Sequence, residues 1–187
     1  MEKTLVMKFG GTSVGDADAI QRAAAIIISA CKDWDHVVVV VSAMSGVTDL
    51  LLAGANAAIE GEIKRADEIA RQIQKKHSTV IKNLLVKSSE KSYAKEHVAQ
   101  HLDEFRALCH AVGTLGELSP RALDAISSLG EKMSIALVSA RLRENGCPAE
   151  AVSATELIRT DDTFLAAYPD MILTRQLSRA RIFPLFK

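Results

Sequence analysis

The sequence lacks an excess of charge of either sign and lacks any long apolar run. Its 23 lysine and arginine residues balance 23 aspartate and glutamate residues, so no overall positive field would recruit nucleic acid or an anionic membrane. Runs such as AAAIIISA and HVVVVVSAM are too short to cross a bilayer, and no secretory leader pattern opens the chain. We therefore expect a cytoplasmic protein that binds neither nucleic acid nor membrane.

Cysteine is scarce as well. The three cysteines, Cys31, Cys109 and Cys147, are an odd number without CxxC spacing, which fits reduced thiols better than a disulfide framework or a zinc site. We expect reduced, mostly buried thiols. With 187 residues, 48% of them hydrophobic, the chain is long enough to bury a core of its own.

Glycine and proline are absent from residues 62–112. Apolar residues recur there at helical spacing, which predicts two long helices. The polar segment KSSEKS (87–92) is the predicted turn between them. This helical hairpin would be an insertion of about residues 62–112.

The N-terminal segment has the pattern of a βαβ unit. Residues 3–9 (KTLVMKF) predict a strand, and Asp16 is a candidate N-cap for a helix of about four turns. HVVVVV (36–41) lacks alternation and is typical of a buried parallel strand. Because parallel strands need a crossover connection, the loops after both strands should meet at one edge of the sheet.

Further along the chain, the patterns alternate between helices and polar loops. Residues 49–59 predict a helix, residues 118–146 one further helical stretch, and residues 173–187 a helix near the end of the sequence. CPAEAVSA (147–154) is a short strand candidate, and IRTDD (158–162) is a polar loop. Arg141 and Arg143 are expected to be solvent-exposed charges.

The loop KFGGTSVG raises the question of which phosphate site it could form. A Walker A loop has its lysine after the glycines, whereas Lys8 precedes them, and a dinucleotide fingerprint needs GxGxxG rather than GGxxxG. A lysine at a buried strand end needs a negative partner, and glycine amides beside a helix start offer an anion site. A surface lysine beside a structural glycine turn is the alternative that the residues leave open.

Three segments in order along the chain resemble the aspartate kinase branch of the amino-acid kinase family: KFGGTSVG, VVSAMSGVTDLL, and SLGEKMSIALVSARLRENG followed by IRTDD. The resemblance implies an α/β fold, a three-layer αβα sandwich with a mainly parallel sheet, of which residues 1–187 would be the N-terminal part. It implies transfer of the ATP γ-phosphoryl group to the side-chain carboxylate of L-aspartate. This is the first step towards lysine, threonine and methionine. The implied cofactors are ATP and Mg²⁺, and the parent enzyme is expected to be a homo-oligomer.

The resemblance also implies roles for individual residues. Lys8 would stabilise the transferring phosphoryl group, and Gly10, Gly11 and Ser13 would hold its oxygens. Thr48 and Ser42 would contact the substrate amino acid, although helix capping is the ordinary role for hydroxyls at such positions. Glu131 would pair with the substrate ammonium, although a helical glutamate beside Lys132 ordinarily faces solvent.

The family pattern continues beyond residue 187 with the segments that hold adenine, the β-phosphate and the metal, and then with regulatory domains. We therefore expect this polypeptide alone to be weakly active or inert, and its sheet to expose an apolar face or edge. Three alternatives remain at this point: a kinase for another carboxylate such as glutamate, a non-catalytic amino-acid-binding module, and a dehydrogenase that uses a dinucleotide.

Overall fold

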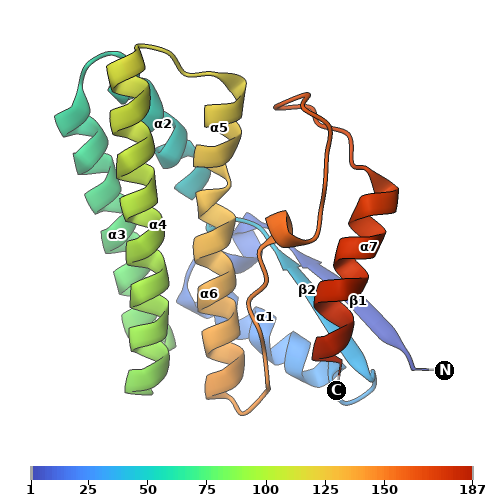
Figure 1. The fold of residues 1–187 in the computed structure, drawn as a ribbon. Coiled ribbons are helices and arrows are strands. Elements are labelled where there is room, and N and C mark those ends of the chain that lie inside the picture. Colours follow the sequence, from blue (N-terminus) through green and yellow to red (C-terminus); the bar gives the residue numbers. More distant parts are fainter. Residues whose placement is uncertain (1, 187) are drawn as a thin grey trace. The chain divides into compact units, whose positions relative to one another are not determined.

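The computed structural model describes residues 2–186 and divides the chain into two compact units, one within Met1–Glu150 and one within Ala151–Lys187. Figure 1 shows the elements of each. Within residues 2–186, no helix is both long enough and apolar enough to cross a membrane.

The predicted βαβ unit is confirmed. Strand β1 (Thr4–Phe9) and strand β2 (His36–Val41) pair in parallel, and helix α1 (Ala17–Ala30) connects them. The register runs from Thr4 beside His36 to Phe9 beside Val41. Asp16 caps α1 by accepting a hydrogen bond from the Ala19 amide, 2.8 Å away. The carboxyl ends of both strands therefore lie at one edge.

The two faces of this sheet differ within the first unit. Met7, Phe9, Val39 and Val41 pack against the helical core, whereas Val6 is 64% and Val40 49% exposed on the other face. Strand side chains alternate between faces, so one face carries the core contacts. The exposed valines agree with the expectation of an apolar face that is left open.

Three helices form the body of the first unit: α2 (Val47–Ile59), α3 (Ile63–Leu84) and α4 (Ser88–Leu115). Helix α2 begins two residues before the predicted start. Helices α3 and α4 form the predicted hairpin (Figure 1), and α2 packs against both. Phe105 of α4 is fully buried against Gly54 of α2, where an added Cβ would lie 2.5 Å from the ring. This small residue allows α2 and α4 to approach closely.

The hairpin turn does not lie at KSSEKS, which was a wrong prediction. Helix α3 ends at Leu84 and α4 begins at Ser88, so most of KSSEKS forms the first turns of α4. The amides of Val86 and Lys87 both donate to the Glu144 carboxylate, at 2.6 and 2.7 Å. Glu144, which is 57 residues from Lys87, thus helps to define the turn. No local sequence pattern indicates this interaction.

The helical stretch 118–146 is two helices, α5 (Pro120–Ser127) and α6 (Leu129–Glu144), separated at Ser128. The prediction that Arg141 and Arg143 are solvent charges was wrong. The Arg141 guanidinium bonds to Glu144 at 2.8 Å and to the Leu84 carbonyl at 3.1 Å. Arg143 pairs with Glu90 of α4 at 2.9 Å and lies over the Tyr93 ring. Both arginines therefore fasten the end of α6 to the hairpin.

The strand predicted at 147–154 is not formed: residues 147–153 have no regular structure and Ala154–Glu156 is a short 3-10 turn. In the second unit, helix α7 (Met171–Ile182) is capped by Asp170, which accepts from the amides of Ile172 and Leu173. An ion pair of 2.9 Å between Arg181 and Glu156 ties α7 to the 3-10 turn. A single antiparallel bridge joins Thr160 to Pro169.

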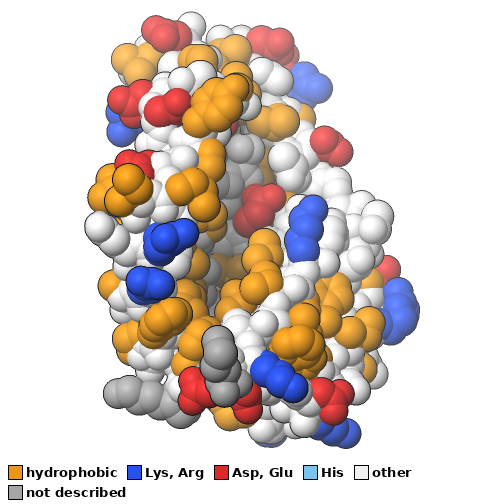
Figure 2. Space-filling model, turned by 90° about the vertical axis from the view of Figure 1, so that its right-hand side faces the viewer, with side chains coloured by type: hydrophobic (Ala, Val, Ile, Leu, Met, Phe, Trp, Pro, Cys, Tyr) orange, Lys and Arg blue, Asp and Glu red, His pale blue; other side chains and the backbone are white. Residues whose placement is uncertain are grey.

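Acidic, basic and apolar side chains are interspersed on the face that Figure 2 turns towards the viewer. Neither sign of charge dominates that face. This mixture agrees with the zero net charge of the sequence.

Glu144 generates a prediction about acid stability. Burial alone would raise its pKa, but the amides of Lys87 and Val86 and the Arg141 guanidinium outweigh burial and hold the pKa below its usual value. A lowered carboxyl pKa contributes stability above the unfolded pKa, and this contribution is lost as the pH falls through the folded pKa. We expect Glu144→Gln to lower the free energy of unfolding at pH 7 by about 1–3 kcal/mol. Its stability should fall less steeply than that of the wild type below about pH 5.

Urea unfolding at pH 7 and pH 4 measures both effects. Glu96→Gln is the matched control, because Glu96 is an exposed residue of α4. Equal losses in the two variants at pH 7 would contradict the role assigned to Glu144.

Candidate functional site

The candidate site lies at the carboxyl edge of the two parallel strands. The loop 10–15 follows β1 and the loop 42–46 follows β2. Because Phe9 and Val41 are register partners, the two loops start side by side. The Ser42 amide donates to the Phe9 carbonyl at 3.1 Å, which holds the start of the second loop against the first.

Ala43 is the residue at which three distant segments meet. Its amide donates to Glu131 Oε1 at 3.3 Å. A Cβ added at Gly11 would lie 2.9 Å from its carbonyl oxygen, and a Cβ added at Gly130 would lie 2.7 Å from its own Cβ. Ala43 itself is 4% exposed. Glycine at 11 and 130 therefore provides the space for the loop after β1 and the start of α6 to close on Ala43.

Ala43 and the neighbouring Ser45 were missed from the sequence. Gly15 contacts Ser45 in the same way, with an added Cβ 3.3 Å from the Ser45 Cβ. The available signal was the run of small residues in SAMSG directly after a buried strand. That run indicates close backbone packing, but it does not show which distant glycines pack there.

Glu131 does not extend into solvent beside Lys132. It is half-buried in the first turn of α6 and faces the loop after β2 through the Ala43 amide. Lys132 instead lies 3.6 Å from Glu104 of α4. A carboxylate at this edge, next to backbone of both loops, is placed where a cationic group of a ligand could reach it.

The ordinary explanation for Thr48 and its neighbouring hydroxyls, helix capping, does not hold. The N-cap of α2 is Gly46, with φ of 75°, and no side chain caps this helix. Thr48 is a half-buried residue of the first turn, and Ser42 is half-buried directly after β2. Both hydroxyls lie on the segment that Glu131 contacts, and neither is explained by a capping role.

Lys8 is not at a buried strand end, so the burial argument from the sequence was wrong. Its side chain is exposed and belongs to the same face as Val6, opposite the helical core. Among residues 2–186, no carboxylate forms an ion pair with it. Lys8 thus shares the strand edge with the other candidates but, in the part of the chain described, forms no ion pair with Glu131 and no side-chain hydrogen bond with Thr48 or Ser42.

An anion at this edge would be bound by the loop after β1 and not by the N-terminus of α1. Asp16 occupies the N-terminus of α1 with its own carboxylate, which offsets the positive end of that helix. The Ser13 amide bonds to the Gly10 carbonyl at 2.9 Å within the 3-10 turn Gly11–Val14, so the exposed Ser13 hydroxyl is the group it can offer. Nothing would lie within 4 Å of a Cβ at Gly10, so this position is open to a ligand.

A phosphate chain fits these residues, because an exposed ammonium, an open glycine and an exposed hydroxyl follow one another along the loop. A resident metal does not fit them in the same way. Within residues 2–186, no group of three or more His, Cys, Asp or Glu side chains converges to hold a metal ion.

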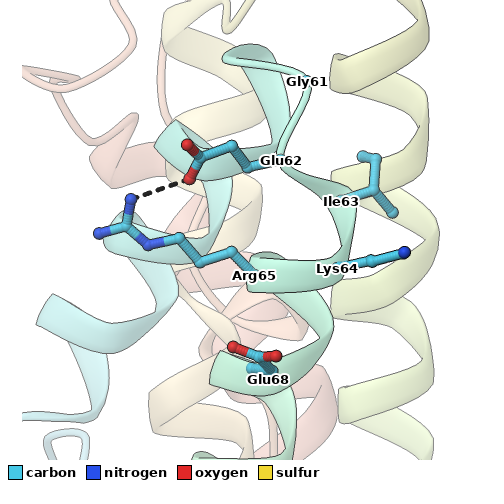
Figure 3. A pocket seen from close by; sticks show the side chains of 6 residues that line it. All are labelled: Gly61, Glu62, Ile63, Lys64, Arg65 and Glu68. Carbon is cyan, nitrogen blue, oxygen red and sulfur yellow. Dashed lines mark hydrogen bonds and ion pairs between the residues drawn. The ribbon is translucent and has the colours of Figure 1, made fainter.

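A shallow depression is formed by residues of the α2–α3 turn, which belong to neither the loop after β1 nor the loop after β2. Residues 61–65 and Glu68 line it, and Figure 3 shows Arg65 directed at Glu62, with Lys64 pointing away from that pair. The Arg65–Glu62 distance is 2.9 Å. This depression brings together none of the candidate residues.

Comparison with known proteins gives three consistent findings. The model of the amino acid kinase family matches residues 3–180. The lysine-sensitive aspartokinase 3 of Escherichia coli is 32% identical over 184 residues, which cover 98% of this chain and 38% of that protein. A chloroplastic aspartokinase 3 of Arabidopsis thaliana is 33% identical, over 85% of this chain and 28% of its own length.

Solved structures agree with these relatives. E. coli aspartokinase III in complex with aspartate and ADP matches with a TM-score of 0.84 at 30% identity, covering 99% of this chain and 38% of that one. The same enzyme with lysine and aspartate gives 0.83. Clostridium acetobutylicum aspartate kinase, at 18% identity and a TM-score of 0.72, shares the fold. This chain spans less than two fifths of the length of each of these structures.

The two adjacent glycines generate a prediction. Gly11→Ala would place a methyl group 2.9 Å from the Ala43 carbonyl, which is backbone and cannot move aside freely, whereas Gly10→Ala meets nothing within 4 Å and has an extended backbone at φ of −75°. We expect Gly11→Ala to lower the free energy of unfolding by about 1–3 kcal/mol. Gly10→Ala should leave it unchanged within about 0.5 kcal/mol.

Chemical denaturation of the two variants in parallel tests this difference. If Gly11→Ala is as stable as Gly10→Ala, the close approach of the two loops at Ala43 is not what the structure implies.

Proposed function

This chain belongs to the amino acid kinase family, and we propose that it carries the substrate-binding part of an aspartate kinase, which phosphorylates the side-chain carboxylate of L-aspartate with ATP. The product is 4-phospho-L-aspartate, the first intermediate towards lysine, threonine and methionine. Because the chain covers only 38% of the E. coli relative, the activity of the whole enzyme is proposed here for the protein to which this chain belongs.

The contact between Glu131 and the Ala43 amide carries the proposal. It brings a carboxylate from α6 onto the loop that holds Ser42 and leads into α2, where Thr48 lies in the first turn, at the edge where the loop after β1 also opens. An amino-acid substrate needs an anionic partner for its ammonium and donors for its carboxylates. These groups are available at this one edge.

In this proposal Glu131 binds the ammonium of L-aspartate. The Thr48 hydroxyl donates to a substrate carboxylate, and Ser42 supplies the second hydroxyl contact. Glu131 and the hydroxyls would thus orient the substrate so that its side-chain carboxylate faces the loop after β1. Such positioning is a large part of catalysis in phosphoryl transfer.

The residues of the loop after β1 would act on the phosphoryl group. An aspartate carboxylate is already ionised at neutral pH, so it needs no general base, and the main barrier is the approach of two anions. Lys8 would neutralise charge on the transferring group, while the amides of Gly10 and Gly11 and the Ser13 hydroxyl hold its oxygens. ATP, bound with Mg²⁺, supplies the phosphoryl group. We expect the metal ligands to come mainly from ATP.

Aspartate binding is the first test. Calorimetric titration of the 187-residue protein should detect L-aspartate, and Glu131→Gln should weaken this binding at least tenfold, because it removes the charge that meets the ammonium. Glu96→Gln is the control and should bind as the wild type does. ATP turnover by the polypeptide alone should be slow or undetectable.

Three results would count against the proposal. Tighter binding of L-glutamate than of L-aspartate would favour a kinase for that acid. Equal affinity in Glu131→Gln and the wild type would remove Glu131 from the site. Rapid aspartate-dependent ATP turnover would overturn the expectation that the polypeptide alone is weak or inert.

Lys8 separates a kinase from a module that only binds an amino acid. We expect Lys8→Ala to weaken binding of MgATP about tenfold or more, since a charge-assisted contact to phosphate is lost, and to leave aspartate affinity unchanged. Lys3→Ala is the matched control, because Lys3 is an exposed lysine directly before the same strand. Unchanged MgATP affinity in Lys8→Ala, measured by the same titration, would favour the non-catalytic module.

A further inference from the structure

Two of the three cysteines lie in contact although they are 116 residues apart. The Sγ atoms of Cys31 and Cys147 are 3.9 Å apart. Cys31 is exposed at the C-cap of α1, and Cys147 is half-buried just after α6. The expectation of mostly buried thiols is therefore wrong for Cys31, and no local pattern in the sequence indicates that Cys31 and Cys147 lie together.

The packing of α1 against α6 brings the two thiols together. These helices contact each other within the first unit, and both end near the pair: α1 at Ala30 and α6 at Glu144. A disulfide requires an S–S separation of about 2.05 Å. The sulfurs must therefore approach by about 2 Å, a distance that side-chain rotation and small shifts in the two chain ends can cover.

We infer that Cys31 and Cys147 are a reversible oxidation site at which hydroperoxides convert two thiols into an intrachain disulfide. Within the cytosol such bonds are typically transient and redox-sensing. This inference concerns the far ends of α1 and α6 and does not depend on the proposed kinase activity.

The chemistry needs one hydroperoxide for each bond. The Cys31 thiolate attacks the peroxide, whose O–O bond breaks; Cys31 becomes a sulfenic acid, and the leaving hydroxide takes up a proton to give water. The Cys147 sulfur then attacks the Cys31 sulfur, loses its proton and expels a second water. Two thiols and one hydrogen peroxide thus give one disulfide and two waters.

Exposure determines the order of the two steps. Cys31 is the thiol that an oxidant in solution can reach. Cys147 is half-buried and therefore acts second; burial, together with the neighbouring Cys31, also raises the pKa of its thiol. Cys109 is buried in α4, and burial together with Asp67 raises its pKa to about 11. It provides an internal control.

The bond would connect the far ends of two helices whose first turns lie at the candidate site. The loop 10–15 leads directly into α1, and Glu131 lies in the first turn of α6. The disulfide would close a loop between two residues that are 116 positions apart. Such a loop strongly restricts the unfolded chain, and we expect the oxidised protein to have a Tm that is roughly 5–15 °C higher.

The test is oxidation of the 187-residue chain with hydrogen peroxide, followed by alkylation in denaturant and mass spectrometry. We expect the number of alkylated cysteines to fall from three to one, a peptide that links Cys31 to Cys147, recovery with dithiothreitol, and the rise in Tm given above. Cys109→Ser should oxidise like the wild type and leave no thiol to alkylate.

Two further variants test the order of the steps. Cys147→Ser should accumulate a sulfenic acid on Cys31 that a dimedone reagent traps, and Cys31→Ser should form no disulfide. Over-oxidation of Cys31 in the wild type without a Cys31–Cys147 peptide, or disulfide-linked dimers through Cys31, would overturn the inference. So would a Cys31–Cys109 or Cys109–Cys147 bond.

Discussion

The candidate site depends on the packing of backbone around Ala43. The loop after β1 approaches its carbonyl, α6 approaches its Cβ, and Glu131 accepts its amide hydrogen. The first two of these approaches need glycine on the opposite side, since a Cβ at Gly11 or Gly130 would lie closer to Ala43 than van der Waals contact allows. Three segments that are distant along the chain, at Gly11, Ala43 and Gly130, thereby share one narrow space.

Helix α6 connects this edge to the rest of the first unit. Its first turn carries Glu131, and its last turn carries Glu144, which holds the α3–α4 turn through two amides. The helix has 16 residues and is therefore about 24 Å long. Because both ends of α6 are bonded to other elements, the position of Glu131 depends on the helical hairpin as well as on the strands.

Much of the fold was readable from the sequence because it rests on local patterns. The parallel strand at 36–41, the Asp16 cap, the hairpin and the position of α7 follow from β-branched runs, side-chain capping and helical spacing, which act within a few residues. The grouping of Lys8, Gly10, Gly11, Ser13, Ser42, Thr48 and Glu131 at one strand edge rested on the family resemblance. The membership in that family is confirmed, and the individual roles stay predictions.

The sequence by itself determined the elements and the order of the motifs along the chain, since propensity and periodicity are properties of neighbouring residues. Tertiary structure decided which distant groups meet: Glu144 with the turn at Val86, Arg143 with Glu90, Cys31 with Cys147, and Glu131 with Ala43. It also decided that Lys8 is exposed and that 147–153 is not a strand. The physical reason is that burial and hydrogen-bond partners at these positions come from segments tens of residues away, where no local preference acts.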